Sequence, residues 1–367
     1  MEAVLQVEQI HALVLLPSLS NNMTKQLVLI YLFFTPINTW GQKTIFEISK
    51  TESYSIIKDS VFVLEIPISI VSDEELNLYL CFKNSIIKLN SEGEITTIRR
   101  AYGRGPGELH SVLTCSIDSN FLFVYDDEKK ELMKFSKDDL DFIDVRITGR
   151  DRIKFITSYN DNVYLLNKSA FVNTISALSV YRGKEFIKED IDIDIPKYSY
   201  LGATRNGGGM TISQYSGYLY YSYLPYPYIW IFNPQTGESK KINIQSDSYK
   251  GIDESDVQRL GNDHVGHISY SFSISRVMGL YFVEPNFIVQ MTEHGNPWDE
   301  QPVSVTLDIY EESQGKVDSF ESDSRVVMTN GNKLYLNPDW DRVLTEYDNA
   351  SSGQRIELFE VLTLIME

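Results

Sequence analysis

The sequence predicts an all-β fold, a six-bladed β-propeller whose blades are four-stranded antiparallel sheets. Short runs rich in Ile, Val, Phe and Tyr arrive in groups of four, and a turn recurs between the last two runs of each group. The turns recur every 38 to 54 residues, with one interval of 78, which is the spacing of blades and not of βαβ units. The six turns are Gly93, Asp138–Asp139, Gly183, Gly237, Gly315 and Gly353.

The groups of runs follow one another along the whole chain after residue 60. The first group opens with a run at 61–66, and the sixth includes runs at 342–347 and 355–359. An open ring would expose unpaired strand edges at both ends. The extra run at 44–49 is therefore expected to pair with the sixth group and close the ring. The groups span 61–99, 114–147, 153–191, 210–244, 280–320 and 325–359.

Residues 43–367 are predicted to form one domain, interrupted by an insertion at about 245–278. Asp253 in this insertion is placed to cap a short helix whose first turn is acidic, as the helix dipole favours. Insertions in repeat proteins lie in loops on one face, which is often the binding face.

Residues 1–42 are interpreted as an extra N-terminal segment and a signal peptide. Lys25 precedes an apolar run at 27–34, and small residues follow near Gly41. Because 22 residues precede this pattern, we expect Met23 to be the true start; the alternative is that the whole segment is an N-terminal anchor. We predict an exported protein, periplasmic or extracellular, with no membrane span in the mature chain, since the apolar run is too short to cross a bilayer.

Composition excludes some partners. With 51 acidic against 33 basic residues, the net charge of −18 argues against nucleic-acid binding, because phosphates would be repelled. Cys81 and Cys115 could pair in an oxidising compartment, but two buried thiols are the favoured interpretation. No metal or cofactor is predicted, and we expect a monomer.

In a four-stranded blade, the links between blades and the links between second and third strands emerge on the same face. The first such inter-blade link contains Gly103-Arg-Gly-Pro-Gly-Glu108. Arg104 and the glycines could bind an anion. The favoured alternative is a tight crossover in which Glu108 accepts hydrogen bonds from the amides of the turn, because no helix follows and no Walker ending is present.

This motif, after the Asn-Ser-Glu-Gly-Glu-Ile hairpin and an arginine-ended strand, resembles a signature of six-bladed propellers exported by Gram-negative gut and environmental bacteria. Those families are related to NHL-repeat and TolB-like propellers. The resemblance implies a fold and an exported location, and it provides no catalytic residues. The chain departs from many such relatives in lacking a lipobox cysteine after the apolar run.

Aromatic residues in the links carry the main functional hypothesis. Tyr226, Tyr228, Trp298 and Trp340 lie near acidic residues and Arg342, a mixture typical of sites that bind a glycan, a peptide or a protein partner. The alternative is that these rings only cover the ends of the sheets. We predict a binding or scaffold module; the second hypothesis is a polysaccharide hydrolase or lyase using paired carboxylates among Asp299, Glu300, Asp339 and Asp341. The candidate ligand-binding residues are Arg104, Glu108, Tyr226, Tyr228, Trp298, Asp299, Trp340, Asp341 and Arg342.

Overall fold

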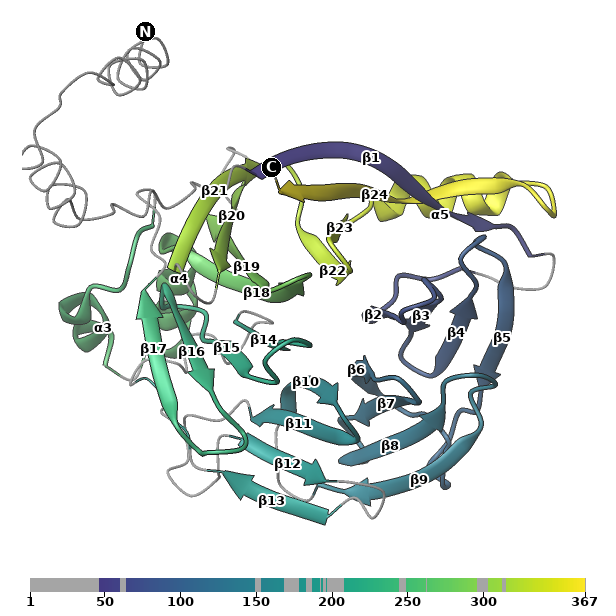
Figure 1. The fold of residues 1–367 in the computed structure, drawn as a ribbon, viewed down its shortest axis with the longest axis horizontal. Helices are drawn as coiled ribbons and strands as arrows, with labels where there is room; N and C mark the ends of the chain where they lie inside the picture. The colour runs from purple at the N-terminus through teal and green to yellow at the C-terminus, as the bar shows by residue number, and fades with distance from the viewer. Residues whose placement is uncertain are drawn as a thin grey trace, which may run out of the picture. The chain divides into compact units, whose positions relative to one another are not determined.

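Six four-stranded antiparallel sheets surround a central axis (Figure 1). The six-bladed propeller predicted from the sequence is confirmed. The predicted signal segment with Met23, the turn at Gly183 and the candidates Trp298 and Asp299 lie outside the described residues. The computed structural model describes residues 46–59, 64–148, 153–167, 178–182, 187–191, 193, 196, 208–243, 249–261, 263–295, 303–311 and 315–366.

Each of the first three blades is a meander in which consecutive strands pair. Blade 1 contains β2 (Ser69–Ser72), β3 (Leu78–Cys81), β4 (Ser85–Leu89) and β5 (Ile95–Arg100). Blade 2 contains β6 (Val112–Ile117), β7 (Phe121–Asp126), β8 (Glu131–Ser136) and β9 (Phe142–Ile147). Blade 3 contains β10 (Ile153–Tyr159), β11 (Asn162–Asn167), β12 (Leu178–Arg182) and β13 (Ile187–Ile191).

The fourth and fifth blades repeat this order, and the sixth takes its outermost strand from the N-terminal side of the ring. Blade 4 contains β14 (Gly209–Ile212), β15 (Leu219–Ser222), β16 (Tyr228–Phe232) and β17 (Ser239–Asn243). Blade 5 contains β18 (Arg276–Val283), β19 (Phe287–His294), β20 (Ser304–Glu311) and β21 (Gly315–Ser322). Blade 6 contains β22 (Val326–Asn330), β23 (Lys333–Leu336), β24 (Arg355–Met366) and β1 (Phe46–Ile57).

The ring is closed by β1, which pairs antiparallel with β24 from Phe46 opposite Met366 to Ile57 opposite Arg355. Pairing of the predicted run at 44–49 with the sixth blade is thus confirmed in outline. The pairing joins the two ends of the chain in one blade through backbone hydrogen bonds, so the outer edge of β24 is paired.

Two strand predictions were wrong. Residues 342–347 belong to a helix, α5 (Trp340–Asn349), so Gly353 precedes β24 and is not the outer turn of the sixth blade. Asp339 caps α5, and Val343 and Tyr347, four residues apart, are buried on one helical face. In the first blade, residues 64–67 form no strand, and the innermost strand is β2.

The core consists of one apolar cluster at each of the six interfaces between neighbouring blades. In β3, Leu78 and Leu80 pack toward blade 6, whereas Tyr79 and Cys81 pack toward blade 2. Successive side chains of a strand point to opposite faces, and both faces of a middle strand are covered. This explains why the sequences of the middle strands are continuous apolar runs.

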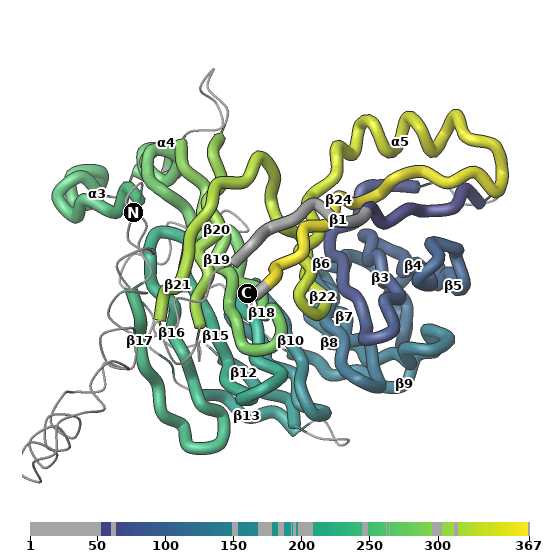
Figure 2. The backbone as a smooth tube through the Cα atoms, turned by 45° about the horizontal axis from the view of Figure 1, so that its top comes forward, coloured from purple at the N-terminus to yellow at the C-terminus, as the bar shows by residue number. Residues whose placement is uncertain are grey.

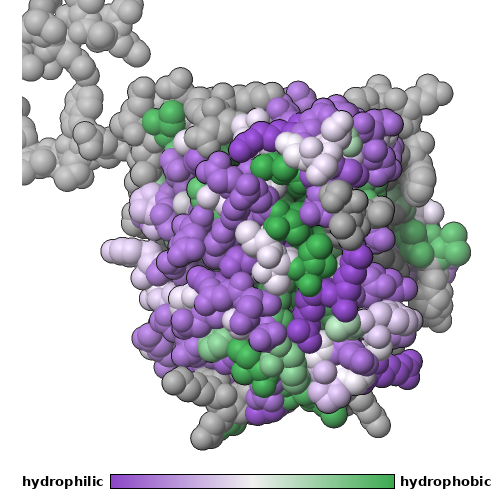
Figure 3. Space-filling view, turned by 90° about the vertical axis from the view of Figure 1, so that its right-hand side faces the viewer, coloured by the Kyte–Doolittle hydropathy of each residue, from purple (hydrophilic) through white to green (hydrophobic). Residues whose placement is uncertain are grey.

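The outermost strands are instead half exposed. In β5, side chains alternate between half-buried and exposed, and Ile98 is among the exposed ones. Figure 3, which views the ring from the right-hand side of Figure 1, shows apolar side chains scattered among a larger hydrophilic surface. Solvent covers these strands on one side, which fits the high charge of the chain.

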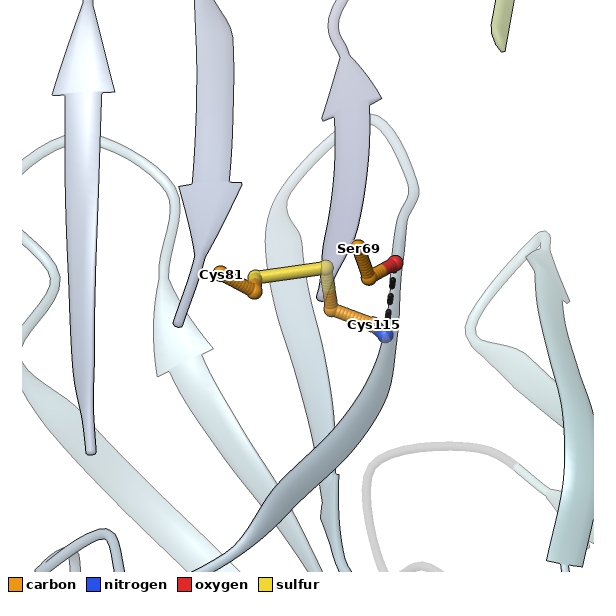
Figure 4. The surroundings of a disulfide bond; sticks show 3 residues. All are labelled: Ser69, Cys81 and Cys115. Carbon is orange, nitrogen blue, oxygen red and sulfur yellow. Dashed lines mark hydrogen bonds between the residues drawn. A yellow bond between two sulfur atoms is a disulfide. The ribbon is translucent and has the colours of Figure 1, made fainter. Parts of the chain in front are cut away.

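Cys81 in β3 and Cys115 in β6 form a disulfide, with Cα atoms 6.9 Å apart (Figure 4). The favoured interpretation of two buried thiols was wrong. The reason is tertiary, because the two strands belong to neighbouring blades and face each other across the first interface. The hydroxyl of Ser69 accepts a hydrogen bond from the Cys115 amide at 3.3 Å beside the bridge.

The insertion between blades 4 and 5 contains two helices, α3 (Glu254–Leu260) and α4 (His264–Ser273), which lie side by side (Figure 2). The predicted cap is confirmed, since the Asp253 carboxylate accepts from the Ser255 amide at 2.8 Å. Asp263 caps the second helix, which the sequence analysis did not predict. No helix in the part of the chain that the structure describes is long and apolar enough to cross a bilayer.

Candidate functional site

We call the two ends of the ring the link face and the turn face. The link face carries the links between blades and the links between second and third strands, such as residues 223–227 of blade 4. The turn face carries the turns that end the innermost strands, such as Asp118–Asn120 after β6. Because neighbouring strands are antiparallel, these two sets of connections lie at opposite ends of the ring.

The structure disperses the predicted site residues over the ring. Tyr228 begins β16 in blade 4 and Tyr226 lies in the link just before it, whereas Trp340 begins α5 in blade 6. Figure 1 shows β16 and α5 on opposite sides of the axis. The described candidates therefore do not share one pocket.

The glycine-rich link between blades 1 and 2 is held by its own Glu108 and by Lys129 from the turn between β7 and β8. The Glu108 carboxylate accepts from the Gly105 amide at 2.6 Å, as the crossover interpretation predicts. The Lys129 ammonium donates to the carbonyls of Gly105 and Glu108 at 3.0 and 2.9 Å. A Cβ at Gly103 would lie 2.1 Å from the Glu108 carboxylate and would displace it from its hydrogen bond with Gly105. Arg104 is exposed at the surface of this link.

The candidates on α5 have structural contacts. Trp340 is half-buried against the core between blades 6 and 1. The Arg342 guanidinium pairs with Glu346 at 3.0 Å on the same helix, and Asp341 lies in its acidic first turn. Asp339, one of the proposed catalytic carboxylates, accepts the Arg342 amide at 3.2 Å as the helix cap.

Tyr226 and Tyr228 line a pocket of about 200 Å³ on the link face. One wall is the Pro-Tyr-Pro-Tyr link of blade 4, residues 225–228, and the other comes from the insertion. This wall agrees with the prediction that the insertion lies on the same face as the links of blade 4. The insertion contributes Tyr249, Gly251, Ile252 and Glu254.

The aromatic rings of the pocket hold one another in place. The rings of Tyr226 and Tyr228 are near parallel, with centroids 6.2 Å apart, and both meet Trp230 edge-on. The Lys241 ammonium lies 4.5 Å from the centroid of the Tyr228 ring. Val257 of α3 packs against Tyr226. The pocket is thus built by packing between a blade and the insertion, which favours a preformed shape.

Tyr249 is the residue of this pocket that the sequence analysis missed. Its side chain is only 7% exposed, and its hydroxyl has no hydrogen-bond partner within the described residues. Burial raises the pKa of Tyr249, and the nearby hydroxyls of Tyr226 and Tyr228 raise the pKa further. A buried hydroxyl without a partner costs about 1–3 kcal/mol, and a water or a ligand that reached it would remove this cost.

A chain of polar side chains ties the insertion to blade 5. The Ser275 hydroxyl accepts from the Lys250 amide at 2.8 Å and contacts Nδ1 of His294 at 2.8 Å. The other ring nitrogen of His294 lies 2.9 Å from the Thr306 hydroxyl. Lys250 follows Tyr249 in sequence, so this chain fixes the backbone of the pocket.

His294 is expected to make the protein less stable in mild acid. Burial lowers the pKa of His294 below its usual 6.5, and Asp308 opposes this only in part. Well above pH 6.5 the ring is neutral in both folded and unfolded states. As pH falls below that value, the unfolded chain binds a proton that the folded one does not, so the free energy of unfolding falls by up to about 1.4 kcal/mol per pH unit.

Urea unfolding between pH 7.5 and 5 measures this slope. The His294→Gln variant is the control, because glutamine keeps hydrogen-bonding groups without titrating, and its slope should be smaller than that of the natural protein. Identical slopes for the two proteins would contradict this role of His294.

No family model and no curated protein matches the sequence. Solved structures do resemble the fold. A member of the DUF4221 family from Bacteroides vulgatus is 10% identical, with a TM-score of 0.64 over 88% of this chain and 98% of that one. A protein from Bacteroides fragilis, named as a candidate exported protein, is 11% identical, with a TM-score of 0.59 over 88% and 96%.

At this level of identity the likeness shows the fold alone. The neighbours agree with the predicted six-bladed ring over nearly all of their own length. The relation to NHL-repeat or TolB-like propellers, and the diagnostic value of the glycine-rich motif, stay predictions.

Proposed function

We propose that this protein is an exported binding module that holds a glycan in the pocket formed by Tyr226, Tyr228 and Tyr249. The observation that carries the proposal is the buried, unpartnered hydroxyl of Tyr249 beside a pocket walled by three tyrosines. Flat aromatic rings stack on the apolar faces of sugar rings, and phenol hydroxyls and a carboxylate bind sugar hydroxyls. Glu254 supplies that carboxylate at the edge of the pocket.

Two observations support an exported location. A structural disulfide persists in oxidising compartments and is rare in reducing ones. One structural neighbour is itself named as a candidate exported protein. Periplasmic and extracellular locations are both compatible with these observations.

A binding role is favoured over the hydrolase or lyase hypothesis. Glycoside hydrolysis requires two carboxyl groups about 5–10 Å apart at one site. Within the described residues, Glu254 is the one carboxylate that lines this pocket, and Asp339 is engaged as a helix cap. Trp298, Asp299 and the residues of α5 remain candidates for secondary contacts with a longer glycan.

Titration calorimetry with xylo-, manno-, cello- and chito-oligosaccharides tests the proposal. We expect one class to bind, and Tyr226→Ala to weaken its affinity by about tenfold or more, because a stacking ring is lost. Tyr215→Ala is the matched control, since Tyr215 is 79% exposed and follows β14 on the turn face. Binding unaffected by Tyr226→Ala, or release of soluble products from the sugar, would contradict the proposal.

The Tyr249→Phe variant separates binding from folding. Removal of a hydroxyl without a partner should leave the free protein as stable as before or more stable by about 1 kcal/mol. The same change should weaken the affinity for the oligosaccharide about three- to tenfold, because one ligand hydrogen bond is lost. A loss of stability without a loss of affinity would assign the hydroxyl a purely structural role.

A further inference from the structure

A second cavity lies on the turn face, at the end of the ring opposite the tyrosine pocket. Its volume is about 450 Å³, and all six blades contribute to its walls. Every blade contributes the end of its innermost strand or the turn that follows it, and blade 2 also contributes Lys137, which follows β8. The cavity therefore lies on the propeller axis. The segments are 72–74, 117–119, 157–160, 211–214, 282–284 and 329–331.

Part of the wall is fixed by internal hydrogen bonds. The buried Asp73 carboxylate accepts from the Asn77 amide at 2.9 Å and from the Tyr79 hydroxyl at 3.1 Å. Asn330 donates to the Ser72 hydroxyl at 3.0 Å and to the Asp73 carbonyl at 2.6 Å, across the seam between blades 6 and 1. Because these groups are already satisfied, they act as the frame of the cavity and not as its ligands.

Three other carboxylates of the wall, those of Asp118, Glu74 and Glu284, have at least one oxygen that accepts no hydrogen bond from the described residues. One Asp118 oxygen accepts the amides of Asn120 and Phe121 at 2.9 and 2.8 Å, while Oδ2 is buried without a partner in the described part of the chain. Burial raises the pKa of Asp118, and the hydrogen bonds from Asn120 and Phe121 and the charge of Lys134 oppose this shift only in part. Glu74 and Glu284 are exposed and form no ion pair within the described ranges.

The positive charge of the wall is smaller and already engaged. Lys137 is the one lysine that lines the cavity, and its ammonium lies 3.9 Å from the Asp73 carboxylate. The neighbouring walls add the hydroxyls of Thr157 and Thr211. A concave wall of one charge sign concentrates ligands of the opposite sign. The wall is rich in acceptors, so it disfavours phosphates and carboxylates and favours a ligand with several N–H and O–H donors.

We propose that the axial cavity binds a small organic cation that carries primary amines. Two observations support this: a cavity of ligand size framed by all six blades, and a wall in which the carboxylates of Asp118, Glu74 and Glu284 outnumber the one lysine. A metal ion is less suited, because no group of three His, Cys, Asp or Glu side chains among the described residues is close enough to hold one. The site is separate from the tyrosine pocket, so either proposal can fail alone.

Titration calorimetry of the full chain with spermidine tests this proposal. We expect saturable binding of one spermidine per chain, and about tenfold weaker affinity in Glu284→Gln and in Asp118→Asn, because each removes a charged acceptor. Asparagine at position 118 keeps the oxygen that accepts the two amides, and Glu284 is exposed, so both variants should fold. Circular dichroism and the melting temperature check this.

Glu238→Gln is the matched control, because Glu238 is an exposed carboxylate in the outer turn of blade 4 that does not line the cavity. The affinity of the Glu238→Gln variant for spermidine should differ from that of the natural protein by less than twofold. Equal weakening in all three variants would show nonspecific attraction to an acidic protein and overturn the proposal. Absence of saturable binding, or binding of Ca²⁺ in place of spermidine, would overturn it as well.

Discussion

Loss of the disulfide between Cys81 and Cys115 is expected to lower the free energy of unfolding by about 4 kcal/mol. The two cysteines are 34 residues apart in sequence, and a cross-link over a loop of this length restricts the unfolded chain by about that amount. The bridge joins β3 of blade 1 to β6 of blade 2, so it also holds the first blade interface together. Net stabilities of domains are only about 5–15 kcal/mol, so the effect should be large.

Urea unfolding of the natural protein with and without a reductant measures this difference. The Cys81→Ala, Cys115→Ala double variant is the control, since its stability should equal that of the reduced protein and should not respond to the reductant. Thiol titration in denaturant should find no free thiol in the oxidised protein, because the chain has two cysteines in all. Equal midpoints for oxidised and reduced protein would exclude a stabilising bridge.

Substitution of Glu293 by glutamine is expected to lower the free energy of unfolding by about 3–5 kcal/mol. The Glu293 carboxylate is buried and accepts from Arg276 at 3.3 Å and, from the next blade, from Arg325. Arg276 is only 1% exposed, and burial lowers the pKa of Arg276 while Glu293 opposes that shift. Removal of the carboxylate leaves a buried guanidinium without its counter-charge, which is the costly way to break such a pair.

The Glu346→Gln variant provides the control for this experiment. Glu346 pairs with Arg342 at 3.0 Å on the exposed face of α5, and surface pairs four residues apart contribute less than about 1 kcal/mol. Thermal and urea unfolding should therefore show a much larger loss of stability for Glu293→Gln than for Glu346→Gln. If Glu293→Gln were no more damaging than Glu346→Gln, the buried network would have no role in joining blades 5 and 6.

The repeat of turns and the aromatic strand runs were sufficient to predict the ring. Blade number and antiparallel sheets follow from local signals such as the turn glycines Gly93 and Gly237, and both have a positive φ in the structure. Closure by the N-terminal strand follows from the need to pair the edges of the ring. The same local signals misplaced the sixth turn, because the run at 342–347 was interpreted with a period of two. The spacing of Val343 and Tyr347 after the cap Asp339 was the available sign of a helix.

The candidate site was predicted only in part. Tyr226 and Tyr228 were found because they are aromatic residues in a link between strands, and both line a pocket. Tyr249 is in no such link, and its role depends on the insertion folding back onto blade 4. Nothing in the sequence around His294 marks its partners either, and it contacts Ser275 and Thr306 from two other segments.

The sequence by itself determined the class of fold, the number of blades and the face that carries the insertion, because these depend on local turns and on the period of side chains along a strand. The tertiary structure alone decided which distant residues meet. Ring closure brings the ends of six innermost strands to one axis, so the cavity with Asp118 and Glu284 has no signature in any single segment. For the same reason, the pairing of Cys81 with Cys115 became visible only once blades 1 and 2 were packed face to face.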